Sequence, residues 1–389
     1  MDNVLFKDTR IIQDFKTTTF SGYDKKQVIA ELKKKILECR VETAVTLAFE
    51  LLACGDINKI YTILDWVIFR KIGIQNPVLP YRYFRRFKQF LQIRKQIINN
   101  LKETGKKDTK HDIEKQAELE LRNSTRIRNQ IAELITILCH SGKKNTKTAI
   151  KCKSEDFHTN KIKEMTKSGD NNYVHSIIRL GDSPETRMAC NEIMWGIIQK
   201  NETHARYWIS WLFQWDAYLL SNGVKLECAS RNHIMDSIDN KDISWLLWDM
   251  LLTNANKLDE RIQLNIHAIF NIYKYKWSTN NKKSRIHYIL LVVDYLTKLY
   301  SIGKGIIADS SQYIKQAAYY YPIIIKMKKK EVIDIGKTMY KVDLKHKRPL
   351  IPNNELELTE KQRNRLRRKI KVKKSEEKLL TVYKLDSQI

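Results

Sequence analysis

Apolar residues recur at helical spacing through the first 140 residues. Asp24 and Gln27 form a capping box, and apolar positions then follow every three or four residues from 28 to 52. The charged segment Glu38–Arg40 divides this run into two helices, and Gly55 and Gly73 mark later helix ends. The pattern predicts helices within residues 24–54 and over 57–72, 81–101 and 113–139, with a turn at 76–80.

The pattern changes at residue 141. Residues 141–172 are rich in Lys, Thr, Ser and Asn and hold few large apolar residues, which predicts a mobile linker or a long loop. Helical spacing returns over 173–321, where Ser183 and Pro184 form a helix start. Short strands or irregular structure are expected over 322–352, followed by a polar tail with one more helix.

These elements predict an all-α protein with two helical-hairpin blocks. The predicted parts are an N-terminal helical domain over 1–140, a lysine-rich linker or loop over 141–172, a Trp-rich helical domain over 173–345 and a basic C-terminal tail over 346–389. The chain holds 12 Gly and 6 Pro, so few tight turns are expected, which also favours helices over a many-stranded sheet.

Six cysteines without a CxxC pair indicate free thiols in a reducing, intracellular setting. No run of 18 apolar residues occurs, so no transmembrane segment is expected.

Charge separates this chain from most proteins of its size. The 71 Lys and Arg outnumber the 44 Asp and Glu, giving a formal net charge of +27. Such an excess repels itself unless a polyanion neutralises it, and the commonest polyanions are nucleic acid and anionic membrane. We expect nucleic-acid phosphate as the partner. The excess is concentrated in residues 82–95, in the lysine-rich insertion and in residues 361–374, where nine of fourteen residues are Lys or Arg. The predicted nucleic-acid-binding residues are Arg82, Arg85, Arg86, Lys88, Arg363, Arg365, Arg367, Arg368, Lys369 and Lys371.

Each basic or aromatic segment also has a structural interpretation. The tail could be a solvated basic segment or a localisation signal. Phe84, Phe87 and Phe90 alternate with the basic residues of the 81–101 helix. Packing of these rings in the core is favoured over stacking on nucleobases. The tryptophans between Trp195 and Trp248 recur at helical spacing, which favours a core over a partner surface.

The sequence offers little that indicates catalysis. Asp236, Asp239 and Asp242 could bind a metal, but their place at a helix start favours capping. The nine histidines form no zinc-ligand pattern, and no phosphate-binding loop, nucleophile elbow or kinase motif occurs. We therefore expect no catalytic residue, no metal and no cofactor, although an enzyme with an unrecognised site remains a third hypothesis.

Two resemblances add context. Residues 44–80 resemble part of the helical collar of clamp-loader-related ATPases, especially the replication-associated recombination ATPases. The matching residues are Ala44, Leu51, Leu52, Gly55, Asp56, Ile60, Ile72, Gly73, Asn76 and Pro77. Such collars oligomerise and carry no ATPase chemistry. The chain also resembles uncharacterised helical proteins of nucleocytoplasmic large DNA viruses, in Phe20–Tyr23, Glu50–Pro80 and Trp208–Trp248.

Together these features predict a basic, non-catalytic protein of a large DNA virus that binds nucleic acid during genome replication, expression or packaging. The alternative is a virion structural protein, such as a minor capsid component or internal scaffold. Either would lie in the host cytoplasm, at the viral factory, or in the virion, with other viral proteins as possible partners and an oligomer possible. The sequence does not distinguish DNA from RNA.

Overall fold

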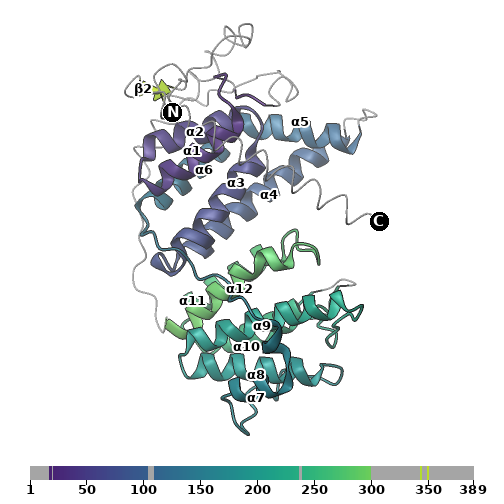
Figure 1. Cartoon of the computed structure of the whole chain (residues 1–389). Coiled ribbons are helices and arrows are strands. Elements are labelled where there is room, and N and C mark those ends of the chain that lie inside the picture. The colour runs from purple at the N-terminus through teal and green to yellow at the C-terminus, as the bar shows by residue number, and fades with distance from the viewer. Residues whose placement is uncertain are drawn as a thin grey trace, which may run out of the picture. The chain divides into compact units, whose positions relative to one another are not determined.

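The computed structural model describes residues 17–19, 21–103, 109–235 and 239–298, together with the strand residues 342–343 and 348–349. The chain comprises two compact units, Met1–Lys329 and Lys330–Ile389. The described part of the first unit is built from helices and connecting segments (Figure 1), which confirms the predicted all-α fold. In the second unit, β1 (Val342–Asp343) and β2 (Arg348–Pro349) pair antiparallel.

The first series of helices follows the apolar pattern closely. Asp24 caps the first helix, because its side chain accepts a hydrogen bond from the Gln27 amide. Cys39, with φ of 59°, breaks the run where the charged segment predicted a break. The helices are α1 (Lys25–Leu37), α2 (Val41–Ala53), α3 (Ile57–Val67, continued as a π-helical turn over Ile68–Ile72), α4 (Leu79–Glu103), α5 (Lys110–Asn123) and α6 (Thr125–His140).

Two boundaries in this series differ from the prediction. The helix expected over 113–139 is two helices, because the Ser124 side chain accepts a hydrogen bond from the Ile127 amide and starts α6. The turn expected over 76–80 ends earlier, since Leu79 and Pro80 already belong to α4. Proline is tolerated there because the first helical turn has no partner for its amide in any case.

The second series begins within the lysine-rich segment, with the short helix α7. Ser183 caps α8 and Pro184 occupies its first position, as predicted. The helices are α7 (Thr159–Met165), α8 (Pro184–Ile198), α9 (Glu202–Ser221), α10 (Ile243–Ala255), α11 (Glu260–Lys274) and α12 (Ile286–Lys298). Across the described residues, no helix combines the length and apolar character needed to cross a membrane.

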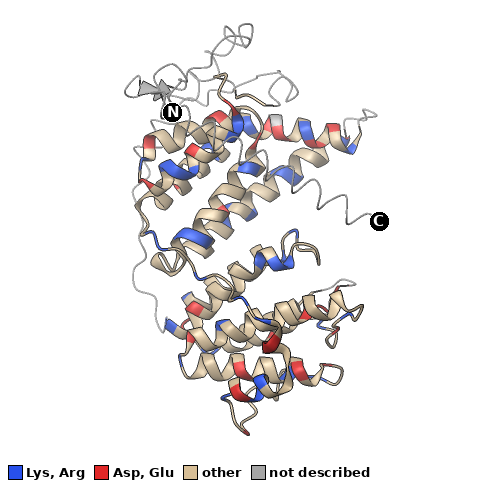
Figure 2. Ribbon diagram, in the orientation of Figure 1, with Lys and Arg blue, Asp and Glu red and all other residues tan. Residues whose placement is uncertain are grey.

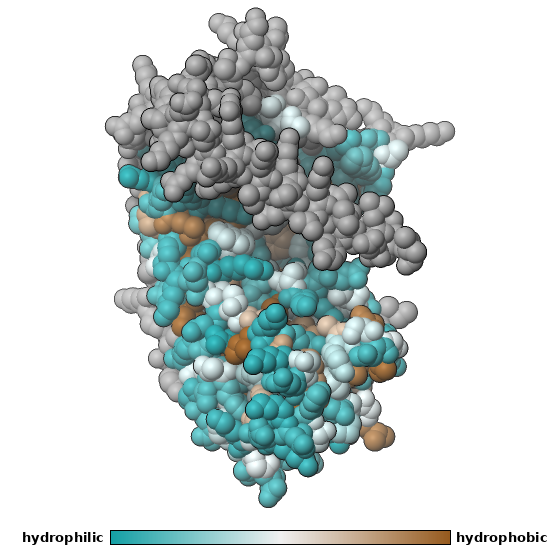
Figure 3. Space-filling model, in the orientation of Figure 1, coloured by the Kyte–Doolittle hydropathy of each residue, from teal (hydrophilic) through white to brown (hydrophobic). Residues whose placement is uncertain are grey.

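Tryptophans form the centre of the second series. Trp208 and Trp211 of α9 and Trp245 and Trp248 of α10 are each 0% exposed. This confirms the core interpretation for these four tryptophans and excludes their rings as a stacking surface, while Trp195 and Trp215 are half-buried. The visible face over α7–α10 is mainly hydrophilic, with scattered apolar positions (Figure 3).

The segment 141–172, expected to be a mobile linker or a long loop, contains the short helix α7. The amides of Ile150 and Cys152 donate hydrogen bonds to Ser210 and Gln214 of α9, each at 3.0 Å. Earlier in the segment, the Lys144 amide donates to the Lys71 carbonyl at 2.7 Å. The segment is a long connection, but these side-chain and backbone partners from elsewhere in the chain fix its path.

The helices predicted as two domains lie in one unit. Tyr81 at the start of α4 donates its amide to Asn265 of α11 at 2.9 Å, and the Tyr295 hydroxyl of α12 donates to the Pro77 carbonyl at 2.8 Å. The first and second helical series are therefore joined within Met1–Lys329. The compact unit extends to Lys329, and the predicted boundary at 345/346 lies outside the described residues.

Candidate nucleic-acid interface

Two of the predicted phosphate-binding residues form ion pairs with another helix of the protein. Arg82 and Arg86 lie one turn apart on α4, and their guanidinium groups reach Glu133 of α6 at 2.6 and 2.7 Å. Glu133 is only 7% exposed. A buried carboxylate requires such partners, so these two arginines hold α4 against α6 rather than presenting free charge to a ligand.

The other two predicted residues of this helix face solvent. Arg85 and Lys88 are exposed, and Lys95 and Lys102 continue the same side of α4. Among the residues that the structure describes, no carboxylate lies within 4.0 Å of these four charged groups. We call Arg85, Lys88, Lys95 and Lys102 the α4 stripe.

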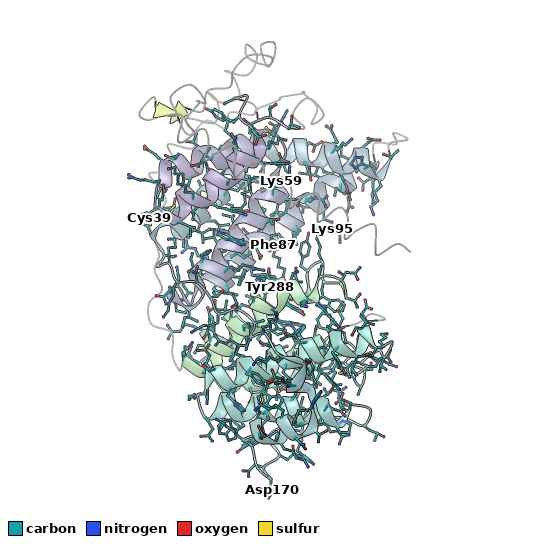
Figure 4. All side chains as sticks on the ribbon, viewed as in Figure 1. Cys39, Lys59, Phe87, Lys95, Asp170 and Tyr288 are labelled. Carbon is teal, nitrogen blue, oxygen red and sulfur yellow. The ribbon has the colours of Figure 1, made fainter. Side chains whose placement is uncertain are left out.

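The α4 stripe is long and free of acids over most of its length. With a rise of about 1.5 Å per residue, Arg85 and Lys102 lie about 25 Å apart along the helix. The helix contains no Asp or Glu before Glu103. Figure 2 shows basic positions along α4, and Figure 4 labels Lys95. Such a row can contact several successive phosphates of a strand laid along the helix.

The aromatic residues of α4 do not join this surface. Tyr83, Phe87 and Phe90 are buried, and the Tyr83 and Phe87 rings stack with centroids 5.9 Å apart. The prediction that core packing outweighs base stacking is confirmed for Phe87 and Phe90, while Phe84 is half-buried. The α4 stripe is therefore positively charged but has no exposed aromatic rings between its basic residues on which nucleobases could stack.

The connection after α6 carries a second row of exposed lysines that was not among the predicted site residues. Lys151 and Lys153 are exposed on either side of the buried Cys152, whose amide is held by α9. Lys144 and Lys147 are exposed earlier in the segment, and no acid occurs between residues 141 and 153. The absence of acids could have indicated this basic row from the sequence. The path of the segment could not be predicted, because it depends on hydrogen-bond partners on α9.

The predicted tail residues lie outside the described residues. They are Arg363, Arg365, Arg367, Arg368, Lys369 and Lys371. Their role in binding stays a prediction.

One of the three aspartates considered as metal ligands, Asp242, has a capping role. Asp242 caps α10 by accepting from the Ser244 amide, and the Lys282 ammonium lies 2.6 Å from its carboxylate. The capping prediction is confirmed for Asp242, while Asp236 lies outside the described residues. Within the described ranges, no cluster of three or more His, Cys, Asp or Glu could hold a metal ion.

Comparison with known proteins adds no family to these observations. No family model, no curated protein and no solved structure matches the chain.

Proposed function

We propose that this protein binds the phosphate backbone of nucleic acid as a non-catalytic component of a large DNA virus. The observation that carries the proposal is the α4 stripe, a row of four exposed basic side chains. Among the residues that the structure describes, no carboxylate lies within ion-pair distance of them. The lysines of the 141–153 connection and the net charge of +27 support it. Binding would release counterions from the nucleic-acid strand. It would also relieve the repulsion among the lysine and arginine side chains of the protein.

Contacts of this kind fix a strand on the protein without identifying its sequence. Lysine and arginine on an exposed helix reach phosphates readily, whereas base identity is read by side chains that enter a groove. We therefore expect similar affinity for unrelated sequences. A role in genome replication, expression or packaging needs no more selectivity than this.

The direct test measures affinity for duplex and single-stranded DNA and RNA across a salt series. The logarithm of the binding constant should fall linearly with the logarithm of salt concentration, with a slope of about −0.9 per phosphate neutralised on a duplex. Absence of binding at low salt, or affinity that does not change with salt, would contradict the proposal.

The place of action follows from the same proposal. We expect the protein at sites of viral genome synthesis in the host cytoplasm, with its recovery sensitive to nuclease. Stoichiometric recovery from purified virions after nuclease treatment would instead favour the virion structural role, in which the basic surface meets other viral proteins.

A further inference from the structure

A small pocket opens where the two helical series meet within the first unit. It has a volume of about 190 Å³. Figure 4 labels two of its residues, Phe87 on α4 and Tyr288 on α12, which lie on facing elements. The aromatic residues that line it are Tyr61, Tyr83, Phe87, Tyr275 and Tyr288. Five aromatic rings around one small space favour a flat, ring-shaped occupant over a flexible chain.

A carboxylate supplies the pocket with a hydrogen-bond acceptor. Asp65 of α3 lines it and accepts a hydrogen bond from the Tyr288 hydroxyl through Oδ2. No described residue donates a hydrogen bond to Oδ1. A second polar group is unsatisfied as well, because the Tyr61 hydroxyl is buried without a described hydrogen-bond partner. Buried polar groups are normally paired, so this pocket retains capacity for a polar ligand.

The two basic residues at the pocket differ in how far the protein already uses them. Arg285 donates hydrogen bonds to the Ile272 and Tyr273 carbonyls at 2.6 and 2.8 Å and stacks over the Tyr288 ring. Lys276 is exposed, and no described carboxylate lies within 4.0 Å of its ammonium group. Its nitrogen lies 5.3 Å from the Tyr275 ring centre, and Lys276 lines the pocket.

Lys276 also occupies an unusual backbone position. Its φ of 55° is left-handed, and it follows the last residues of α11, where such a conformation ends a helix and glycine is preferred. A lysine here is less favourable for the backbone than glycine would be. The backbone geometry alone therefore does not account for the lysine at this position.

We propose that the pocket binds a single unpaired nucleobase, stacked on the half-buried Tyr275 ring, with an amino or imino group donating to Asp65 and the attached phosphate against Lys276. The inference rests on the proposed nucleic-acid binding. It adds a pocket through which the protein would distinguish a single strand from a duplex. A paired base presents neither its flat face nor its pairing edge, whereas an unpaired base offers both.

The test uses 2-aminopurine, whose fluorescence falls when it stacks and whose amino group is a donor. Two probes are titrated with the full-length protein: free 2-aminopurine riboside, and a short oligothymidine with one central 2-aminopurine. We expect saturable quenching of the oligonucleotide. Tyr275→Leu, Asp65→Asn and Lys276→Gly should each weaken it roughly fivefold or more, the range expected for losing one stacked or anchored base. Tyr218→Leu, at an exposed tyrosine on α9, is the matched control.

A third probe, the same strand with an abasic site at the centre, separates this inference from the proposed function. If the abasic strand binds in a salt-dependent way while neither 2-aminopurine probe is quenched, the pocket inference is overturned and phosphate binding stands. If only the free riboside binds, with the same dependence on Tyr275, the pocket is a nucleoside site and strand binding is overturned. Equal quenching by the wild type and all three pocket variants also overturns the inference. Circular dichroism melts of each variant identify any loss that comes from unfolding.

Discussion

The hydroxyl of Tyr288 donates a hydrogen bond to the carboxylate of Asp65, joining α12 to α3 across 223 positions of the sequence. On the neighbouring turn, a guanidinium nitrogen of Arg70 lies 3.3 Å from Nδ1 of His287. The junction of the two helical series therefore contains an acid, Asp65, and a base, His287, that are both half-buried. Folding and protonation are coupled at this junction.

Replacing Asp65 should change how stability depends on pH. Burial raises the pKa of Asp65 to about 6, against the opposing effect of the Tyr288 hydrogen bond. The folded protein therefore keeps this proton at a pH where the unfolded chain, with an ordinary pKa of about 3.9, has lost it. Stability from this group is present at low pH and is lost as pH rises from about 4 to about 6.

Asp65→Asn should lack that loss. Urea unfolding midpoints measured across this pH range should fall less steeply with rising pH in Asp65→Asn than in the wild type. Asp170→Asn, at an exposed aspartate (Figure 4), should follow the wild type. Parallel curves for all three proteins would show that Asp65 keeps an ordinary pKa.

His287 should act in the opposite direction over nearly the same range. Burial, assisted by Arg70, lowers its pKa to about 3, so the folded protein holds it neutral while the unfolded chain protonates it below about pH 6.5. Its contribution is present above that pH and is lost on acidification. His287→Gln should therefore be less sensitive to acid than the wild type in the same titration, and greater acid sensitivity would count against this assignment.

The arginines of α4 should separate into two kinds by mutation. Arg86→Gln removes a partner from the buried Glu133 carboxylate and should lower the free energy of unfolding by about 1–3 kcal/mol. Lys88→Gln, on the exposed side, should change it by no more than about 0.5 kcal/mol. Chemical denaturation measures both. Equal stability of the two variants would mean that the Glu133 pair contributes nothing.

Removing the α4 stripe should weaken nucleic-acid binding without unfolding the protein. Each lysine or arginine changed to Gln at Arg85, Lys88, Lys95 and Lys102 should reduce the salt slope by about 1, provided each contacts a phosphate. Arg82→Gln serves as the control, since its charge is already engaged by Glu133. An unchanged slope in the fourfold variant would exclude the stripe as the interface.

Deleting Thr359–Ile389 tests the tail independently. The deletion removes the nine Lys and Arg of residues 361–374. It should weaken nucleic-acid binding and flatten its salt dependence. The melting temperature of the unit Met1–Lys329 should not change. If the slope stays at its full-length value, the tail makes no phosphate contacts and the binding surface lies elsewhere.

Gly196 should not tolerate a side chain. A Cβ atom at this position of α8 would lie 2.8 Å from the backbone nitrogen of Ala205 at the start of α9. Gly196→Ala should therefore lower stability by about 1–3 kcal/mol, although alanine normally favours a helix over glycine. Gly142→Ala, whose Cβ would meet Gln75 at an ordinary 3.4 Å, should melt close to the wild type.

Much of the local structure could be predicted from the sequence, because local patterns encode it. Asp24, Ser183 and Pro184 start helices through groups only a few residues away, and the spacing of Trp208 and Trp211 places both on one buried face. The break at Ser124 could have been predicted as well, since serine before a helical run is a capping signal.

The separation of the basic residues of α4 into ion-paired and exposed ones could not be predicted in this way. Arg82, Arg85 and Arg86 look equivalent in sequence, and only Glu133, brought by α6, makes the first and third structural. The path of residues 141–153 likewise depends on Ser210 and Gln214 of α9. Spacing along one chain determines which residues share a helix face. Only tertiary packing determines which charge meets a buried partner and which stays in water, because that partner lies far away in sequence.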